Sequence, residues 1–263
     1  MAHTLQVAPP TPQPRLGGIK AVAGEIITEQ RLGATDSIVW EGTPWATLRD
    51  TRRACFDEEP DEPVAKTFDG VQQFAGVGTP FAKYAGVSCW LGGDDDRTYE
   101  AQARAALEAL EDRAAEAALW EWALAASTAG SPATLAEAIA IAEDYADGVY
   151  PFRPALVLSR HDATLAAAAG VLKEADGKLI THQGTPVIAS GAIPDDDHGT
   201  VAIVGQPKIY ATEIVAVRAP NLAKNTDHAI AERVYAIAVD SEFRFVTAIG
   251  GYTPPAPPEE PTP

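Results

Sequence analysis

The spacing of apolar residues predicts one long helix near the middle of the chain. Between residues 97 and 126, apolar side chains recur every three or four positions, as they do on one face of a helix. At 1.5 Å per residue, this helix would be about 45 Å long and would span a whole flat subunit. Carboxylates at residues 94–96 precede it, where the partial positive charge of a helix N-terminus stabilises negatively charged side chains.

Two shorter helices are predicted after the long one. Ser131 followed by Pro132 is typical of a helix start, and the apolar face that follows ends before Gly148. Ser159 and Asp162 have the spacing of a capping box, which predicts a third helix that ends at residue 170.

Short apolar runs separated by turn residues predict strands on both sides of these helices. Before the long helix, residues 37–93 alternate β-type runs with acidic and turn segments, so we expect a long hairpin or extended loop. The later strands are expected at residues 155–159, 186–190, 201–204, 208–218, 229–240 and 243–249. Helices and strands follow no regular βαβ repeat, so the predicted fold class is α+β.

Proline-rich segments are found at both ends of the sequence. Residues 1–36 have little apolar periodicity and include PPTPQP, while residues 251–263 include PPAPPEEPTP. Such segments favour an extended polyproline conformation and bury too little apolar surface to order alone. We therefore expect an N-terminal arm and a C-terminal tail that neighbouring subunits hold in place.

Composition and charge narrow the possible functions. With 263 residues, 46% of them hydrophobic, the chain can bury a substantial core without disulfides or metal ions. Its formal net charge of −17 argues against binding of nucleic acid, which needs clustered lysines and arginines. The apolar stretches are too short to cross a bilayer and residues 1–19 have no signal-peptide core, so we expect a cytoplasmic protein without a membrane partner.

No pattern of residues predicts catalysis, a cofactor or a metal site. Ser159, His161 and Asp162 are neighbours on one helical turn, whereas a catalytic triad is assembled from separated elements, so the capping role is favoured. Residues 195–197 with His198 lack the ligand spacing of a calcium loop and are interpreted as a solvated turn. No glycine-rich phosphate-binding motif is present, and we expect no enzymatic activity.

The sequence does offer candidate residues for contacts between subunits. Glu232 and Arg233 interrupt the otherwise apolar strand AIAERVYAI, so one of them must reach solvent or pair at an interface. Trp40 and Trp45 lie in the hairpin region, where anchors for flat packing between subunits are expected. A plain surface strand and ordinary core packing are the alternatives for the charged pair and the tryptophans.

Several stretches, taken in order, carry a resemblance to a known family. They are IVWEGTPW (38–45), TPFAKYAGVSCW (79–90), YEAQARAALEALEDRAAEAALWEW (99–122), PALVLSRHDATLAAAAGVL (154–172) and NTDHAIAERVYAIAVD (225–240). Together they resemble the major capsid proteins of tailed bacteriophages, particularly those of actinobacteriophages. None of these stretches is diagnostic alone, and the resemblance lies in their order along most of the chain.

The resemblance implies the Hong-Kong-ninety-seven-like phage capsid fold. In that fold a long spine helix and a sheet form the peripheral domain, and a second domain surrounds the capsomer axis. The implied segments are an N-terminal arm (1–36), an extended loop (37–93), a peripheral domain (94–130 and 208–250), an axial domain (131–207) and a C-terminal tail (251–263).

The same resemblance implies a structural protein whose main partner is itself. Copies would assemble as pentamers, hexamers or both into an icosahedral shell that encloses double-stranded DNA, with a second capsid or decoration protein as a further partner. The protein would belong to the virion and assemble in the host bacterial cytoplasm. Some family members cross-link an extended-loop lysine to a neighbour's asparagine. Lys66, Asn221 and Asn225 are of these types, but no motif selects a pair, so we expect non-covalent assembly.

Two other function classes compete with this interpretation. An encapsulin-like compartment shares the fold and encloses an enzyme cargo instead of DNA. A small-molecule enzyme with a pocket near His161 or His182 is the second rival, and the lack of spaced catalytic partners argues against it.

Overall fold

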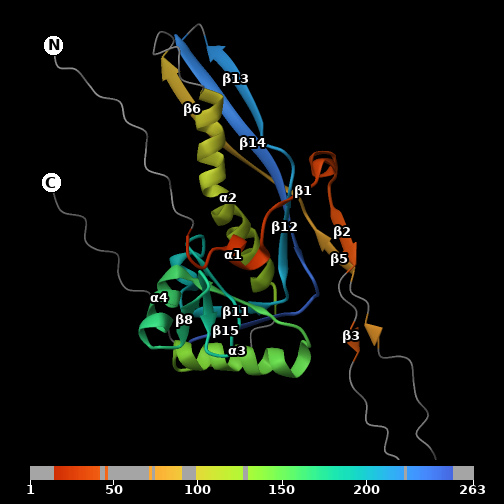
Figure 1. Ribbon diagram of the computed structural model, residues 1–263, viewed down its shortest axis with the longest axis vertical. Coiled ribbons are helices and arrows are strands. Elements are labelled where there is room, and N and C mark those ends of the chain that lie inside the picture. The colour runs from red at the N-terminus through yellow and green to blue at the C-terminus, as the bar shows by residue number, and fades with distance from the viewer. Residues whose placement is uncertain are drawn as a thin grey trace, which may run out of the picture.

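The computed structural model describes residues 15–41, 45–46, 71–72, 75–90, 99–126, 130–221 and 224–250. The molecule is elongated and has two halves (Figure 1). A five-stranded sheet lies along the long helix in one half, and a four-stranded sheet with two shorter helices forms the other. The fold class is α+β, as the sequence predicts.

Helix α2 (Tyr99–Leu124) is the long helix predicted over residues 97–126. It packs lengthwise on the five-stranded sheet, mainly on strands β14 (Thr226–Val239) and β6 (Phe81–Trp90). The side chains that it buries recur at the three- and four-residue spacing from which the helix was predicted. Residues 94–96, which were expected to precede its first turn, lie outside the described residues.

The five-stranded sheet is built around β14. Strands β12 (Pro207–Ala211) and β13 (Val215–Asn221) follow one another along one edge of β14, β6 pairs with its other edge, and β1 (Ile27–Thr28) pairs with β12. The prediction of one strand over residues 208–218 is wrong, because the regular ladder is interrupted at Thr212. There the Thr212 hydroxyl accepts a backbone N–H of β14, in place of a backbone carbonyl.

The four-stranded sheet has the order β10–β7–β11–β15. Its strands are β7 (Ala155–Ser159), β10 (Val187–Ser190), β11 (Thr200–Val204) and β15 (Arg244–Ala248). Helices α3 (Leu135–Val149) and α4 (Arg160–Ala168) cover one face of the sheet, and the end of α2 covers the other. Both faces of β7 are therefore buried, which explains its unbroken apolar sequence.

One strand of this second sheet corrects the expected domain boundaries. Residues 243–249 do form a strand, but β15 pairs with β11 and not with the sheet around β14. After β14 the chain therefore crosses back to the half that contains α3 and α4 (Figure 1). A hairpin of β8 (Leu172–Ala175) and β9 (Lys178–Thr181) follows α4 and completes this half.

The two shorter helices begin at side-chain caps. The Ser159 hydroxyl accepts the backbone N–H of Asp162 at 3.0 Å, which confirms the predicted start of α4. For α3 the cap is Thr134, whose hydroxyl accepts the N–H of Glu137 at 3.2 Å, while the Glu137 carboxylate accepts the N–H of the residue before Thr134 at 2.8 Å. The prediction of Ser131 as the cap is wrong by three residues, because this reciprocal pair sets the helix start.

The segment before residue 37 is more ordered than its sequence suggests. Helix α1 (Ile19–Ala23) and a 3-10 turn, η1 (Gln30–Ala34), lie within it, and Ile19 is completely buried. Helices this short have no room for a repeating apolar pattern, which is why the interpretation of residues 1–36 as a plain arm is wrong for its second half. Residues 1–14 lie outside the described residues.

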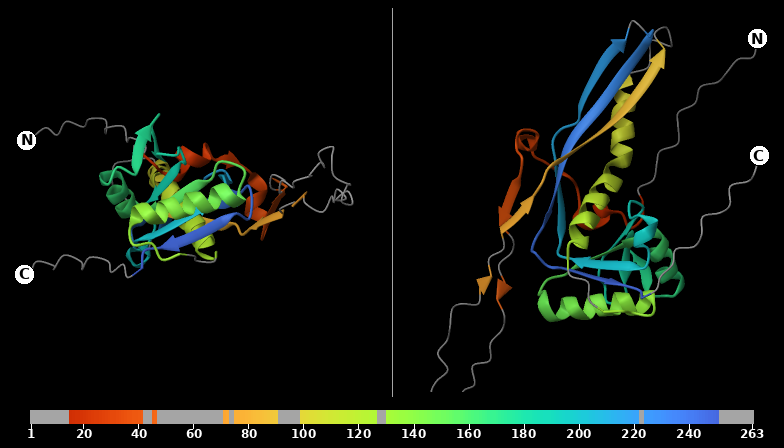
Figure 2. Two further views of the ribbon diagram at one scale, coloured as in Figure 1. Left: turned by 90° about the horizontal axis from the view of Figure 1, so that it is seen from below. Right: turned by 180° about the vertical axis from the view of Figure 1, so that it is seen from behind.

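A two-stranded ribbon projects beside the five-stranded sheet (Figure 2). Strand β2 (Ile38–Glu41) pairs with β5 (Ala75–Gly78), and β3 (Trp45–Ala46) pairs with β4 (Val71–Gln72) farther out. The antiparallel pairing confirms the predicted hairpin in its described strands. The expected boundary at residue 93 is wrong, because β6 already belongs to the five-stranded sheet.

Candidate assembly surfaces

Neighbouring residues of β14 point to opposite faces of the five-stranded sheet. Ala231 and Tyr235 are buried, whereas Ile230 and Glu232 are exposed. Because side chains alternate along a strand, Arg233 points towards α2 together with Ala231 and Tyr235, and Glu232 points away from it. We call the face of the sheet opposite α2 the outer face.

Arg233 is bound within its own chain. Its guanidinium contacts the carboxylate of Glu111 on α2 at 2.5 Å and also donates to the carbonyl oxygen of Thr212 at 2.5 Å. The side chains of Arg233 and Glu111 are only 12% and 5% exposed. The sequence analysis considered solvent or a neighbouring subunit as the destination of these charges, and the structure shows a third arrangement, an internal ion pair.

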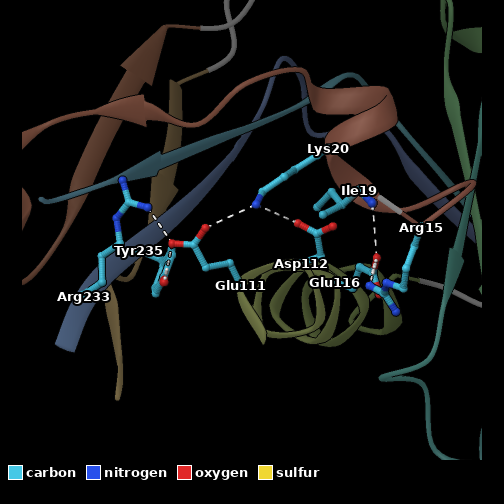
Figure 3. Close-up of polar contacts among 8 residues, drawn as sticks. All are labelled: Arg15, Ile19, Lys20, Glu111, Asp112, Glu116, Arg233 and Tyr235. Carbon is cyan, nitrogen blue, oxygen red and sulfur yellow. Dashed lines mark hydrogen bonds and ion pairs between the residues drawn. The ribbon is translucent and has the colours of Figure 1, made fainter. Parts of the chain in front are cut away.

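Glu111 belongs to a row of carboxylates on α2 that holds the segment around α1 (Figure 3). Lys20 contacts Glu111 at 3.2 Å and Asp112 at 3.1 Å, and the hydroxyl of Tyr235 donates to Glu111 at 2.9 Å. Burial by itself would lower the pKa of Lys20, but the hydrogen bond and charge of Asp112, reinforced by Glu111, hold this pKa above its usual range. Burial and the charge of Glu111 raise the pKa of the Tyr235 hydroxyl.

Glu116 is the completely buried member of this row. Its carboxylate accepts hydrogen bonds from the Arg15 guanidinium at 2.9 Å and the backbone N–H of Ile19 at 3.2 Å (Figure 3). It also accepts one from the hydroxyl of Ser190 at 2.9 Å. Ser190 lies on β10, so this carboxylate joins the α1 segment to both halves of the molecule. The three donors satisfy a charge that would otherwise be costly to bury.

The carboxylate row is a feature that sequence reasoning missed. We attributed no role to Glu111 or Glu116, although the helical period offered a signal. Glu111 lies four residues from the buried Leu107 and from the buried Ala115, so it falls on the buried stripe of α2. A carboxylate at such a position needs a cationic partner, and the identity of that partner depends on the tertiary structure.

The outer face of the sheet carries a patch of exposed apolar side chains. Tyr84, Val215 and Val217 are 74%, 60% and 58% exposed, and Ile230 is 46% exposed. The strand register places Tyr84, Glu232 and Val215 in one row across the sheet and Val217 beside Ile230 in the next. Glu232 thus lies within an apolar surface, and patches of this kind commonly mark contacts between proteins.

Trp40 is the remaining predicted interface residue whose side chain the structure describes, and it lies on strand β2 of the ribbon. The indole N–H of Trp40 donates to the carbonyl oxygen of Val239 at 2.8 Å, so this ring is anchored on the end of β14. A Cβ atom at Gly78 would approach the Trp40 ring to 2.9 Å, which indicates that the ring packs closely over this glycine. The side chain of Trp45 and all of Lys66 lie outside the described residues.

Ser159, His161 and Asp162 make structural contacts in the described part of the chain, as do Asp197 and His198. The Ser159 hydroxyl donates to the carboxylate of Asp162 at 2.7 Å, and both side chains are buried at the start of α4. The ring of His161 stacks on that of His198 with centroids 4.8 Å apart, and Asp197 accepts the indole N–H of Trp120 at 2.8 Å.

Two further kinds of feature are absent from the described residues. No group of three or more histidine, cysteine, aspartate or glutamate side chains among them is placed to hold a metal ion. None of the described helices is long and apolar enough to cross a membrane.

Solved capsid structures share this architecture at low sequence identity. A structure from Mycobacterium phage Che8 matches with a TM-score of 0.54 and 15% identity, over 94% of this chain and 96% of that one. The capsid of an empty GTA particle matches with a TM-score of 0.55 and 15% identity, over 94% and 95% of the two chains. The mature capsid of bacteriophage PhiM1 matches with a TM-score of 0.52 and 10% identity, over 96% and 93%.

Sequence comparisons by themselves identify no relative. No family model and no curated protein sequence matches the chain. The chain has the Hong-Kong-ninety-seven-like fold of phage major capsid structures, as its resemblance to that family implied.

Proposed function

We propose that the protein is a structural major capsid protein that assembles with copies of itself into the icosahedral shell of a phage. The observation that carries the proposal is the match to capsid structures over 94% to 96% of this chain. The shell would consist of pentamers, hexamers or both, and would enclose double-stranded DNA.

The projecting ribbon supports assembly. A two-stranded hairpin is at best marginally stable by itself in water, so a ribbon built from β2, β5, β3 and β4 would be stabilised by contact with a second subunit. We assign it to the extended loop of the capsid fold, ending before β6. We assign the sheet around β14 with α2 to the peripheral domain, and the sheet around β7 with α3 and α4 to the axial domain.

The outer face is the second surface that favours self-association. Burial of a valine or a similar side chain contributes about 1.5–3 kcal/mol relative to full exposure, so covering Tyr84, Val215 and Val217 would favour a contact. The carboxylate of Glu232 within this patch would select a partner surface with positive charge. We therefore keep Glu232 as an interface residue, whereas Arg233 is occupied inside the subunit.

The net charge fits a container rather than a DNA-binding protein. At −17 per chain, an assembled shell would repel the phosphates of packaged DNA, so the genome would be confined without sequence-specific contacts. The protein would then reside in the virion after assembly in the bacterial cytoplasm. A second capsid or decoration protein would be a further partner on the outside of the shell.

Sedimentation and electron microscopy of the purified full chain test this function. We expect rings or closed shells, and a sample that contains only the 27.7 kDa monomer at high concentration, with its circular dichroism intact, would refute the proposal. The contents of particles from infected cells separate the two container functions. Nuclease-protected DNA is expected for a capsid, and an enzyme guest would instead indicate the encapsulin-like alternative.

A substitution on the outer face tests the proposed contact. Val217→Glu changes an exposed residue, so the subunit should keep its circular dichroism and its unfolding midpoint. Burying the new carboxylate between subunits would be unfavourable, and we expect at least a tenfold loss of assembled particles. An unchanged particle yield would show that this face is not a contact surface.

A further inference from the structure

A groove of about 520 Å³ lies on the side of α2 that faces away from α1. Three aromatic side chains, Trp40, Phe81 and Trp122, line it. They come from β2, from the first residue of β6 and from the last turns of α2, so the groove lies between the ribbon and the spine helix. Neither the fold comparison nor the proposed contact at the outer face assigns a ligand to it.

Each of the three rings is held in place by a contact within the subunit, and the partners of Phe81 and Trp122 lie outside the groove lining. The indole N–H of Trp40 donates to Val239, and the Phe81 ring stacks on Tyr235 with centroids 5.7 Å apart. The guanidinium of Arg244 lies 4.7 Å from the centre of the Trp122 ring. Rings that are fixed before binding lose little conformational freedom when a ligand arrives, so the groove is preorganised.

The base of the groove is formed by small residues of α2. Ala114, Ala117 and Ala118 lie on one side of this helix, opposite Glu116, the carboxylate that holds Arg15. Ala117 is exposed and Ala114 and Ala118 are half-buried. Alanines between fixed aromatic rings leave an apolar surface with little side-chain bulk, which suits an extended chain.

Grooves lined by aromatic side chains are the surfaces on which proteins recognise proline-rich segments in the polyproline conformation. Such a segment loses little entropy on binding, because proline restricts it in advance. The chain itself contains a segment of this kind after Gly250, namely PPAPPEEPTP at residues 254–263, outside the described residues. We propose that the groove of one subunit binds residues 254–263 of a second subunit.

The groove lining carries one exposed charge of each sign, Lys83 and Glu121. In the proposed complex Glu259 and Glu260 pair with Lys83 and lie away from Glu121, whereas PPTPQP at residues 9–14 carries no charge that could pair with Lys83. Within one subunit, residues 9–14 are also joined to Arg15, which Glu116 holds on the opposite side of α2.

The position of Gly250 favours a segment that comes from a second subunit. Gly250 donates its N–H to the carbonyl oxygen of Pro132, beyond the end of β15 that is farther from Arg244. A tail of the same subunit would have to turn back across the four-stranded sheet to reach Trp122. This inference extends the proposed self-assembly by naming one contact, but the binding event itself needs only two chains.

Photo-cross-linking in the full-length protein tests the inference. We place benzoylphenylalanine at Ala117 in ¹⁵N-labelled chains, mix them with unlabelled wild-type chains, and identify the cross-linked peptides by mass spectrometry. Ala105, another exposed alanine of α2 outside the groove, carries the same probe as the control. Cross-links from position 117 to residues 251–263 of the other isotope are expected. Cross-links confined to one chain, to another segment, or no more abundant than at position 105 would overturn the proposal.

A binding measurement separates this inference from the proposed shell. A fluorescein-labelled peptide of residues 251–263 is titrated with full-length protein, and we expect Ala117→Glu to weaken its binding at least tenfold while the equally charged Ala105→Glu changes it less than twofold. A peptide with alanine in place of its prolines should bind at least tenfold more weakly. Equal binding by both peptides, or equal effects of both protein variants, would overturn the proposal. Peptide binding by a chain that forms no particles would support the groove and refute the capsid function alone.

Discussion

Removing the guanidinium of Arg233 should destabilise the subunit from within. In Arg233→Met, the carboxylate of Glu111 stays 5% exposed and loses the partner that lies 2.5 Å away. Breaking a buried ion pair by deleting one partner costs about 3–5 kcal/mol. We expect the lower end, about 3 kcal/mol, because the Tyr235 hydroxyl at 2.9 Å and Lys20 at 3.2 Å remain bound to Glu111.

Glu232, the residue before Arg233 on β14, provides the matched control for the loss of a charge. Glu232→Gln removes one charge from the same strand, but on the exposed outer face, so its effect on the free energy of unfolding should stay within about 0.5 kcal/mol. The measurement is urea unfolding of dissociated subunits, followed by circular dichroism, with the dependence on urea concentration checked for each variant. Equal destabilisation by Arg233→Met and Glu232→Gln would refute the reasoning from the buried pair.

A double variant examines the same pair more directly. Glu111→Gln combined with Arg233→Met removes both charges, so no unpaired ion stays buried and part of the lost stability should return. The pairing also affects how assembly experiments are interpreted. Arg233→Glu would place a second carboxylate beside Glu111, so a loss of shells in that variant would report a damaged subunit and not a lost contact between subunits.

Three further changes test other parts of the structure. Ile19→Ala should lower the free energy of unfolding by about 2–5 kcal/mol, measured by urea denaturation, because Ile19 is completely buried; no effect would mean that α1 is only a loose arm. Thr134→Ala should lower the free energy of unfolding by about 1 kcal/mol in thermal unfolding, and Ser131→Ala by less than about 0.5 kcal/mol, because Thr134 caps α3. A larger loss in Ser131→Ala would place the cap at Ser131. The hydrogen bond from Arg218 holds the pKa of Asp227 below its usual range, so its stabilisation is present above about pH 4 and is lost as pH falls through the lowered value. The stability deficit of Asp227→Asn should therefore shrink in acid, and a deficit that is constant with pH would contradict this.

The sequence by itself determined the features that depend on neighbours along the chain. The period of apolar residues predicted α2 to within two residues at each end, and Ser159 with Asp162 predicted the start of α4, because helix spacing and capping act over a few residues. Unbroken apolar runs predicted β7 and β10 for the same reason. The order of these stretches also carried the resemblance to phage capsid proteins.

Only the tertiary structure decided which distant groups meet. The pattern of residues 243–249 shows that they form a strand, but pairing with β11 depends on the path of the whole chain, since the backbone hydrogen bonds of a strand do not depend on its side chains. Likewise, the charge of Arg233 required a partner, and folding brought it to Glu111, 122 residues away in the sequence. A charged side chain within an apolar strand can be satisfied by solvent, by a neighbouring subunit or by a distant residue of the same chain. The local sequence is the same in all three cases, so it cannot select one of them.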